Sequence, residues 1–208
     1  MEHSYFREKQ GVGAETERLV SLLVKDLGSS FFSSGEKLVV SHCHDVSPVK
    51  QKGPMCGLVG LTMAAQLLMK ASSPCHTSSK THPERILEYA VQNGLSRHGE
   101  MFSTSAMEQI IENHLLLKAQ VVMVQSHNYS ALRDLIVQVV SGQKAVLVPY
   151  DADKDHRPCL ARGHSAHWCL LVGVCVVMKS DENWASSALE YCEETSPANT
   201  HYHVIRET

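Results

Sequence analysis

The chain carries the stretch QKGPMCGLVGLTMAAQLLMK at residues 51–70, and this stretch decides the fold. Its first part is polar and turn-forming, whereas its second part is an apolar run with the length of a helix. Gly53-Pro54 is a strong turn signal, and proline is favoured just before or at the first helical position. The sequence therefore predicts a helix that begins within a residue or two of Cys56.

A cysteine at the start of a helix has a chemical advantage as a nucleophile. Unpaired backbone N–H groups and the positive end of the helix dipole stabilise a thiolate there, and the thiolate is the reactive form. Gln51 lies a short turn upstream and could aim its amide N–H at an oxyanion that forms beside the sulfur. The working interpretation is a cysteine hydrolase. The alternative is that Cys56 is a small buried side chain, as most cysteines are.

His167 is the candidate general base. It follows a charged loop at residues 151–162 and precedes Trp168 and an apolar run. A histidine there can accept the thiol proton and later donate it to a leaving amine. His164 is the rival within the same segment, GHSAHW at residues 163–168. We favour His167 because Trp168 and the apolar strand would fix its rotamer, while His164 lies toward the loop.

A third side chain is expected to orient His167 through its other ring nitrogen. This is normally an asparagine or aspartate at the start of the following strand. The nearest polar candidates downstream are Asn183 and Asp181. Both lie in a polar run, residues 180–183, that would also suit an ordinary turn, so the choice between them stays open.

Clusters of histidine, cysteine and aspartate raise the question of a bound metal. Five side chains of the types that zinc prefers lie close to one another in sequence or near the motifs: His42, Cys43, His44, His164 and His167. Their spacings match neither a zinc finger nor an HExxH helix, and 13 histidines make chance clusters common. The alternating acids Asp151, Asp153 and Asp155 lack the glycine and the closing glutamate of a calcium loop. We therefore expect no metal and no cofactor, and we expect this acidic loop at the mouth of the cleft.

Composition indicates one ordinary globular domain. The 208 residues are 43% hydrophobic and 20% charged, with a net charge of −3. No basic cluster suits nucleic acid, no apolar run reaches the roughly 18 residues that span a bilayer, and no signal peptide is apparent. Seven cysteines without framework spacing fit a reducing compartment. We expect a cytoplasmic protein with a peptidase domain over residues 1–180, its core at about 37–178, and a polar tail at 181–208 that is loosely ordered or truncated.

Periodicity and capping signals predict an alternation of helices and strands. Helices are expected at residues 14–28, 56–70, 81–94, 109–117 and 130–140, and strands at 37–40, 120–125, 145–150 and 169–178. Ser105 and Glu108 resemble a capping box, and the last apolar run has the length of a buried central strand. A nucleophile on an early helix and a histidine on a later strand is the papain-like order. The expected fold is α+β, with the nucleophile helix packed on an antiparallel sheet.

The segments QKGPMCGLV at residues 51–59 and GHSAHW at 163–168 resemble the actin maturation protease family, which is related to C39-like and papain-like cysteine peptidases. The resemblance spans roughly residues 38–177. It implies a papain-like or C39-like fold and an aminopeptidase that removes an N-acetylated Cys or Met from immature actin. By this resemblance Cys56 is the nucleophile, His167 the base and Gln51 the oxyanion donor, in a mechanism that passes through an acyl-enzyme.

Two other functions fit the same residues. A general C39-like or deubiquitinase-type endopeptidase would use the same thiol chemistry on internal peptide bonds. A catalytically inactive actin-binding module would result if the shortened C-terminal part lacks an essential residue. Thiol reactivity at Cys56 and the position of the cleaved bond distinguish these three functions.

Overall fold

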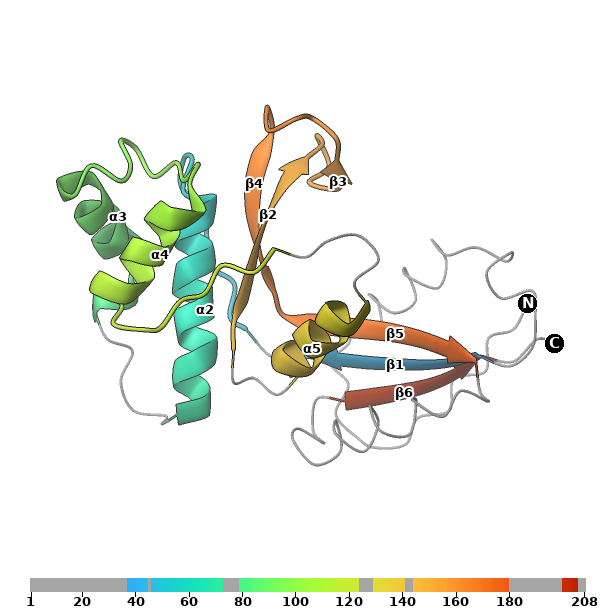
Figure 1. Ribbon diagram of the computed structural model, residues 1–208. Helices are drawn as coiled ribbons and strands as arrows, with labels where there is room; N and C mark the ends of the chain where they lie inside the picture. Colours follow the sequence, from blue (N-terminus) through green and yellow to red (C-terminus); the bar gives the residue numbers. More distant parts are fainter. Residues whose placement is uncertain are drawn as a thin grey trace. The chain divides into compact units, whose positions relative to one another are not determined.

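Helices and antiparallel strands make up this computed structural model, which describes residues 37–44, 46–72, 79–123, 129–140, 144–179 and 200–205 (Figure 1). The expected α+β class is confirmed, whereas the helix predicted at residues 14–28 lies outside the described residues. In chain order the elements are β1 Lys37–Cys43, α2 Cys56–Ser72, the 3-10 helix η1 Ser79–Thr81, α3 Pro83–Gln92, α4 Thr104–Asn113, α5 Tyr129–Val140, β2 Val146–Ala152, β3 Pro158–Cys159, β4 Ala166–Leu171, β5 Gly173–Lys179 and β6 Thr200–Ile205.

The chain divides into two compact units, and each is described by itself. The first unit comprises residues 1–44, 134–141 and 172–208, and the second comprises residues 45–133 and 142–171. Composition alone did not indicate this division. The peptidase domain expected over residues 1–180, with its boundary at the tail, stays a prediction.

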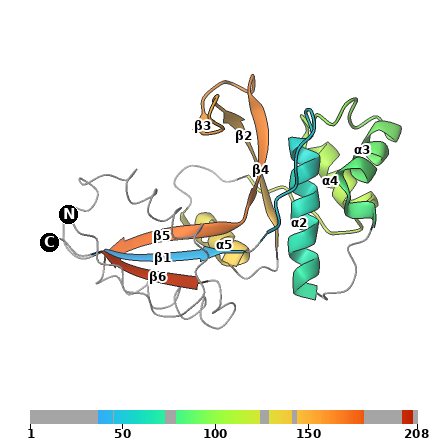
Figure 2. The same cartoon turned by 180° about the vertical axis from the view of Figure 1, so that it is seen from behind.

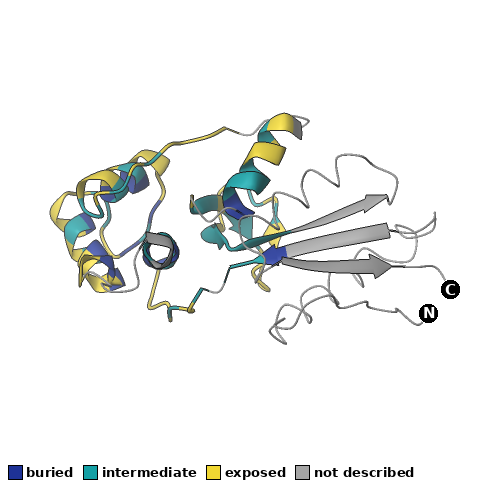
Figure 3. Cartoon of the chain, turned by 90° about the horizontal axis from the view of Figure 1, so that it is seen from below, coloured by how far each residue is buried: buried dark blue, intermediate teal, exposed yellow. Residues whose placement is uncertain are grey.

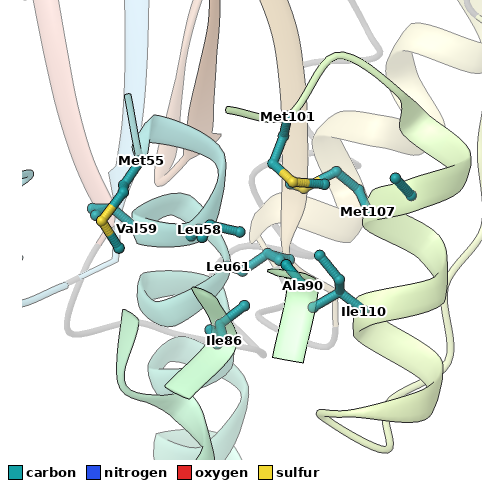
Figure 4. Close-up of a cluster of buried hydrophobic side chains, with 10 residues drawn as sticks. Met55, Leu58, Val59, Leu61, Ile86, Ala90, Met101, Met107 and Ile110 are labelled. Atoms are coloured by element: carbon teal, nitrogen blue, oxygen red, sulfur yellow. The ribbon is translucent and has the colours of Figure 1, made fainter. Parts of the chain in front are cut away.

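The core of the second unit forms between α2, α3 and α4 (Figure 4). Full burial of a large aliphatic side chain stabilises the fold by about 1.5–3 kcal/mol, and Leu58, Ile86 and Ile110 are each 0% exposed. Leu147 and Trp168 pack against this core from the strands. The buried members are Met55, Leu58, Val59, Leu61, Ile86, Ala90, Met101, Ala106, Met107 and Ile110.

Helices α3 and α4 begin at recognisable signals. Pro83 opens α3, where its missing N–H costs nothing, which confirms the helix predicted at 81–94. Ser103 caps α4, because its hydroxyl accepts a hydrogen bond from the backbone N–H of Ala106 at 3.3 Å. The capping box expected at Ser105 is therefore wrong by two residues, and α4 begins at Thr104. Ser103 offers the same hydroxyl chemistry, and the burial of Ala106 and Met107 selects the earlier start.

The second unit also holds a three-stranded antiparallel sheet in the order β3-β2-β4. In β2 and β4, Tyr150 lies directly opposite His167, and Pro149 lies opposite Trp168. Helix α2 lies beside β2 and β4 in both Figure 1 and Figure 2, and it contacts both strands. The expected packing of the nucleophile helix on an antiparallel sheet is thereby confirmed.

The first unit holds the other antiparallel sheet, in the order β5-β1-β6 (Figure 2). Lys37 of β1 pairs with Lys179 of β5 on one side and with Ile205 of β6 on the other. The strand predicted at 37–40 is confirmed and extends to Cys43. Strand β6 falls within the segment that composition described as a polar tail, so part of that segment is paired in a sheet.

Helix α5 confirms the helix predicted at 130–140. Figure 3 shows it changing from exposed at its start to buried at its end. Val139 and Val140 are each 1% exposed. The carbonyl oxygen of Val139 lies 2.5 Å from Nε2 of His44, so this end of the helix is hydrogen-bonded within the first unit.

Two strand predictions are wrong. Residues 120–123 form no strand, and Val122 and Met123 are 59% and 86% exposed, because β-branched composition does not make a strand without a partner and a buried face. The run at 169–178 is not one central strand. It is interrupted at Val172 between β4 and β5, and each of these lies at the edge of its described sheet.

Candidate active site

Cys56 is the first residue of α2, as the turn signal predicted. Gly53 has a φ of 62°, a left-handed value that glycine adopts at little cost. The carbonyl of Met55 accepts the first helical hydrogen bond from the N–H of Val59 at 2.9 Å. Cys56 is half-buried, carries a free thiol and lies in the first turn, where backbone N–H groups have no intrahelical acceptor.

Gln51 is exposed on the turn that leads into this helix. Its side-chain Nε2 donates a hydrogen bond to the carbonyl oxygen of Gly53 at 2.7 Å. An amide nitrogen carries two hydrogens, and this bond uses one of them. The side chain is thereby tied to the turn that precedes Cys56, and its second N–H is the one that an oxyanion would require.

His167 is the second residue of β4 and is half-buried. Its ring meets the ring of Tyr150 edge-on at a centroid distance of 5.7 Å, and it meets the ring of His156 at 5.4 Å. Burial lowers the pKa of His167 below its ordinary value of 6.5, and the neighbouring charge of His156 lowers it further. The imidazole is therefore held in the neutral form that can accept a proton.

Helix α2 contacts β4 at Gly57, the residue after Cys56, and at Trp168, the residue after His167. A Cβ on Gly57 would lie 3.2 Å from Cδ1 of Trp168 and 3.1 Å from Cβ of Met101, so any larger residue would push these side chains away by a few tenths of an ångström. The indole Nε1 of Trp168 also donates a hydrogen bond to the carbonyl oxygen of Met101 at 2.7 Å. The residue after the thiol and the residue after the imidazole are therefore fixed against one another.

The segment that delivers Met101 to this contact is itself ordered by hydrogen bonds. The carboxylate of Glu100 accepts from the backbone N–H of Arg97 at 3.0 Å and from that of His98 at 2.7 Å. These bonds, with the one from its own backbone N–H, lower the pKa of Glu100 below its usual 4.5. The turn keeps Met101 at 4% exposure beside α2.

Tyr150 contacts the histidine, and the charge of the thiol acts on the ionisation of Tyr150. Burial raises the pKa of Tyr150 above 10.0, and the negative charges of Cys169, Cys56 and Asp153 raise it further. The ring of Tyr150 contacts that of His167 edge-on, and Gly57 beside Cys56 approaches Trp168 beside His167. The structure therefore brings Cys56, Tyr150 and His167 into one neighbourhood.

Two aspartates organise the loop between β2 and β4. The carboxylate of Asp151 accepts hydrogen bonds from the backbone N–H of Ala161 at 3.0 Å and from that of Gly163 at 2.9 Å. Oδ1 of Asp153 accepts from the N–H groups of Asp155 and Arg157 at 2.8 and 2.9 Å. Hydrogen bonds from these backbone groups lower the pKa of Asp153 below 3.8. The two carboxylates therefore bind their own loop.

Replacing Asp151 with alanine is expected to loosen this loop. Hydrogen bonds to a charged acceptor contribute about 1–3 kcal/mol each, and part of this is regained from water at a half-buried site. We expect the free energy of unfolding in urea to fall by about 1–3 kcal/mol. Asp155→Ala is the matched control, because Asp155 contributes only its backbone N–H to the turn and keeps it in the variant. Equal stabilities of the two variants would contradict this role.

The other residues that the sequence suggested for the site are His164, Asp181 and Asn183. His164 is exposed in the turn before β4. Asp181 and Asn183 lie outside the described residues, so their assignment stays a prediction. Within the described ranges, no group of three or more His, Cys, Asp or Glu side chains is arranged to hold a metal ion. In that same part of the chain, no helix has the length and apolar character needed to cross a bilayer.

Sequence reasoning missed Tyr150 and His156. Tyr150 reaches His167 only through the strand register, and His156 does so only through the turn between β2 and β3. The alternation of acids at 151–155 was the available signal. These aspartates mark a turn, because aspartate side chains commonly accept hydrogen bonds from nearby backbone N–H groups.

Comparisons with known proteins agree on one family. The model described as actin maturation protease-like, C-terminal domain, matches residues 46–175. The protein named actin maturation protease of Bos taurus is 36% identical over 132 residues, which cover 64% of this chain and 35% of the relative. Its counterpart of Homo sapiens is 34% identical over 140 residues, covering 67% and 37%. That of Mus musculus is 32% identical over 169 residues, covering 81% and 44%.

The relatives are considerably longer than the region they share with this chain. The chain spans less than half of the length of each of these three. No solved structure matches the chain at a significant level. The family model nevertheless covers more than half of the chain and includes both motifs, so this chain belongs to the actin maturation protease-like family, in the region of its C-terminal domain.

Proposed function

We propose that the chain is a papain-like or C39-like cysteine aminopeptidase that acts in the cytoplasm. Its substrate is immature actin, from which it removes the N-acetylated N-terminal Cys or Met. Cys56 is the nucleophile, His167 the general base and Gln51 the oxyanion donor. Membership of the family supports the protease activity and the substrate, and the site supports the chemistry.

The contact between Gly57 and Trp168 carries this proposal. It ties the helix that begins at Cys56 to the strand that carries His167. Nucleophilic catalysis requires a nucleophile and a base held in mutual reach, and the placement of the thiol and the imidazole on packed elements of one unit supports this arrangement. The effect of the Cys56 charge on Tyr150 agrees with this arrangement.

The reaction proceeds in two steps. His167 accepts the thiol proton, and Sγ of Cys56 forms a bond to the carbonyl carbon of the N-acetylated residue. The C–N bond to the next residue then breaks, and His167 donates the proton to the departing amine of the shortened actin chain. In the second step a water molecule, deprotonated by His167, attacks the thioester. The N-acetylated amino acid leaves and the thiol is restored.

The protonation state of His167 suits its role as a base. Burial and the charge of His156 lower its pKa below 6.5, so the neutral imidazole predominates at neutral pH. A neutral imidazole can take the thiol proton, whereas an imidazolium cannot. Below that pKa the base is protonated, and the activity is expected to be lost.

Gln51 provides the donor for the tetrahedral intermediate. Its bond to the carbonyl of Gly53 holds the side chain on the turn before Cys56. One well-placed donor of this kind is worth about 10²–10³ in kcat in enzymes of this class. Asp181 or Asn183 is proposed to orient His167 through its second ring nitrogen.

Mass spectrometry of actin N-termini tests this function. Actin that still carries its N-acetylated first residue is incubated with the purified chain and with Cys56→Ala. We expect the unmodified chain to remove one N-acetylated residue and the variant to be slower by about 10⁴-fold or more, because no other group replaces the nucleophile. Cys159→Ser is the matched control, since Cys159 is another half-buried free thiol of the same unit and is expected to retain activity.

Three other results would replace this proposal. Cleavage at internal peptide bonds would indicate an endopeptidase. Co-sedimentation with actin, without alkylation of Cys56 by iodoacetamide, would indicate an inactive binding module. Equal processing by the unmodified chain and by Cys56→Ala would exclude the thiol mechanism.

A further inference from the structure

We propose that His156 is a positioning residue, which the turn between β2 and β3 holds with its imidazole against that of His167. The inference rests on the proposed function only in taking His167 as the general base. It adds a second histidine to the site, one that neither the motifs nor the resemblance indicated.

The backbone of His156 is the first observation. Its φ is 60°, in the left-handed region that is uncommon for residues other than glycine, although histidine is found there more often than most. A glycine would adopt this conformation without strain. A strained residue persists only where the surrounding structure holds it, and such residues cluster at functional sites. Leu116 and Arg162 share this left-handed conformation, so the role of His156 is argued from the contacts of its side chain.

Hydrogen bonds from both sides hold this residue in place. The N–H of His156 donates to the carbonyl of Asp153 at 3.0 Å, and the N–H of Asp153 donates to the carbonyl of Arg157 at 2.9 Å. The carboxylate of Asp153 accepts two further backbone N–H groups of the same turn. The hydroxyl of Tyr150 donates to the carbonyl of His156 at 3.3 Å. The turn is held by backbone groups and by the side chains of Asp153 and Tyr150, so the side chain of His156 is not needed to form it.

The ring of His156 contacts the imidazole of His167, the proposed base. Its ring lies 5.4 Å from that of His167, with the two planes 41° apart. The ring of Tyr150 contacts the same imidazole edge-on, at 89°, while its hydroxyl holds the backbone of His156. Two aromatic side chains that are linked to each other therefore contact the base, and together they restrict the orientations its ring can adopt.

Charge gives this contact a second consequence. His156 disfavours the charged form of His167, in the same direction as burial. Tyr150 of β2 is the other ionisable group whose ring contacts His167. Cys56 of α2, Cys169 of β4 and Asp153 of the turn act on the ionisation of Tyr150, and Arg157 acts on that of Asp153. The Asp153 carboxylate accepts backbone N–H groups of the turn and interacts with the charges of Arg157 and His156, whereas the charge that acts on His167 is that of His156.

Two substitutions of His156 distinguish the effect of its ring from the effect of its backbone conformation in the turn. His156→Gly removes the ring and relieves the left-handed strain, so its thermal unfolding temperature is expected to stay equal or to rise. His156→Phe keeps an aromatic ring against His167 and loses the charge. Leu116→Gly is the matched control, because Leu116 also has a left-handed φ, 58°, and is 71% exposed in the loop after α4.

Kinetics test the positioning role. For His156→Gly we expect kcat on an N-acetylated actin N-terminal peptide, and the rate of Cys56 alkylation at pH 7.5, to fall by about ten- to a hundredfold, with KM within twofold. His156→Phe should restore most of both rates, and Leu116→Gly should change neither. The proposal is wrong if His156→Gly keeps both rates within twofold, or if a folded His156→Phe is no better than the glycine variant.

An NMR titration tests the contact without any catalysis. The pKa of the His167 imidazole is followed in the Cys56→Ala background, with its signal assigned by loss in His167→Gln. His156→Gly removes both a like charge and a covering ring, so the pKa of His167 is expected to rise. An unchanged pKa would also overturn the proposal. If the peptide is not cleaved but the alkylation rate and the titration change as expected, the actin function fails while the role of His156 stands.

Discussion

Replacing His167 with alanine is expected to lower kcat/KM for the proposed peptidase reaction by about 10⁴-fold or more. In enzymes whose nucleophile and base act as a unit, loss of the base costs nearly as much as loss of the nucleophile. The half-buried imidazole makes ring contacts but is not part of the buried core, so the variant is expected to remain folded. Peptide kinetics and urea unfolding, measured on the same preparation, check both parts.

His164→Ala is the control for this variant. The two histidines lie three residues apart in the same motif, and His164 is exposed in the turn while His167 lies on β4. We expect His164→Ala to keep activity within twofold. If instead His164→Ala loses activity and His167→Ala keeps it, the assignment of the base must be reversed.

Gly57→Val is the second variant for which a large effect is expected. The added Cβ would lie 3.1 Å from Cβ of Met101 and 3.2 Å from the indole of Trp168, and valine brings two methyl groups in addition. Overpacking of a core contact costs about 1–3 kcal/mol. Because the contact joins α2 to β4, we also expect the alkylation rate of Cys56 and kcat to fall by about 10²-fold, the usual effect of a displacement near 1 Å.

Gly60→Ala provides the comparison on the same helix. A Cβ at Gly60 would lie 3.0 Å from Cδ2 of Leu147, which is the end of a flexible side chain and can turn away. Chemical denaturation is expected to show a smaller loss for Gly60→Ala than for Gly57→Ala, with activity retained. Equal losses at the two positions would show that the contact with Trp168 has no special role.

The helices could be predicted because their signals are local. Gly53-Pro54 marked the start of α2, and Pro83 marked the start of α3. These signals act within one turn of backbone, so they operate in the same way in any fold. Two nearby serines offer the same capping chemistry, which is why the N-cap of α4 was misplaced by two residues.

Strand pairing could not be predicted from the same information. Val121 and Val122 have the composition of a strand and form none, since composition does not supply a partner. The run that continues through Val172 is apolar, and Gly173 is the only residue in it that could mark a bend or a close backbone approach. A glycine does not indicate that the two halves of the run pair in different sheets. Partner choice depends on segments distant in sequence, and a single sequence does not encode it locally.

The candidate site divides in the same way. Cys56 and His167 could be chosen from residue type and motif, and they lie in one unit with their neighbours in contact. His156 could not, because its position depends on a left-handed turn and on the register between Tyr150 and His167. A residue such as His156, whose proposed role depends on its position in the fold, cannot be found from a sequence motif.

The position of β1 in its sheet has a consequence for the order in which the chain can fold during synthesis. Its partners lie at residues 173–179 and 200–205, so none of its ladder hydrogen bonds can form until more than 120 further residues have been made. The buried members of the core around α2 lie between residues 55 and 110, and the partly buried Leu147 and Trp168 join this core from the later strands. The helix that carries the thiol can therefore acquire its core early on the ribosome, whereas β1, although made before it, must wait for the far end of the chain.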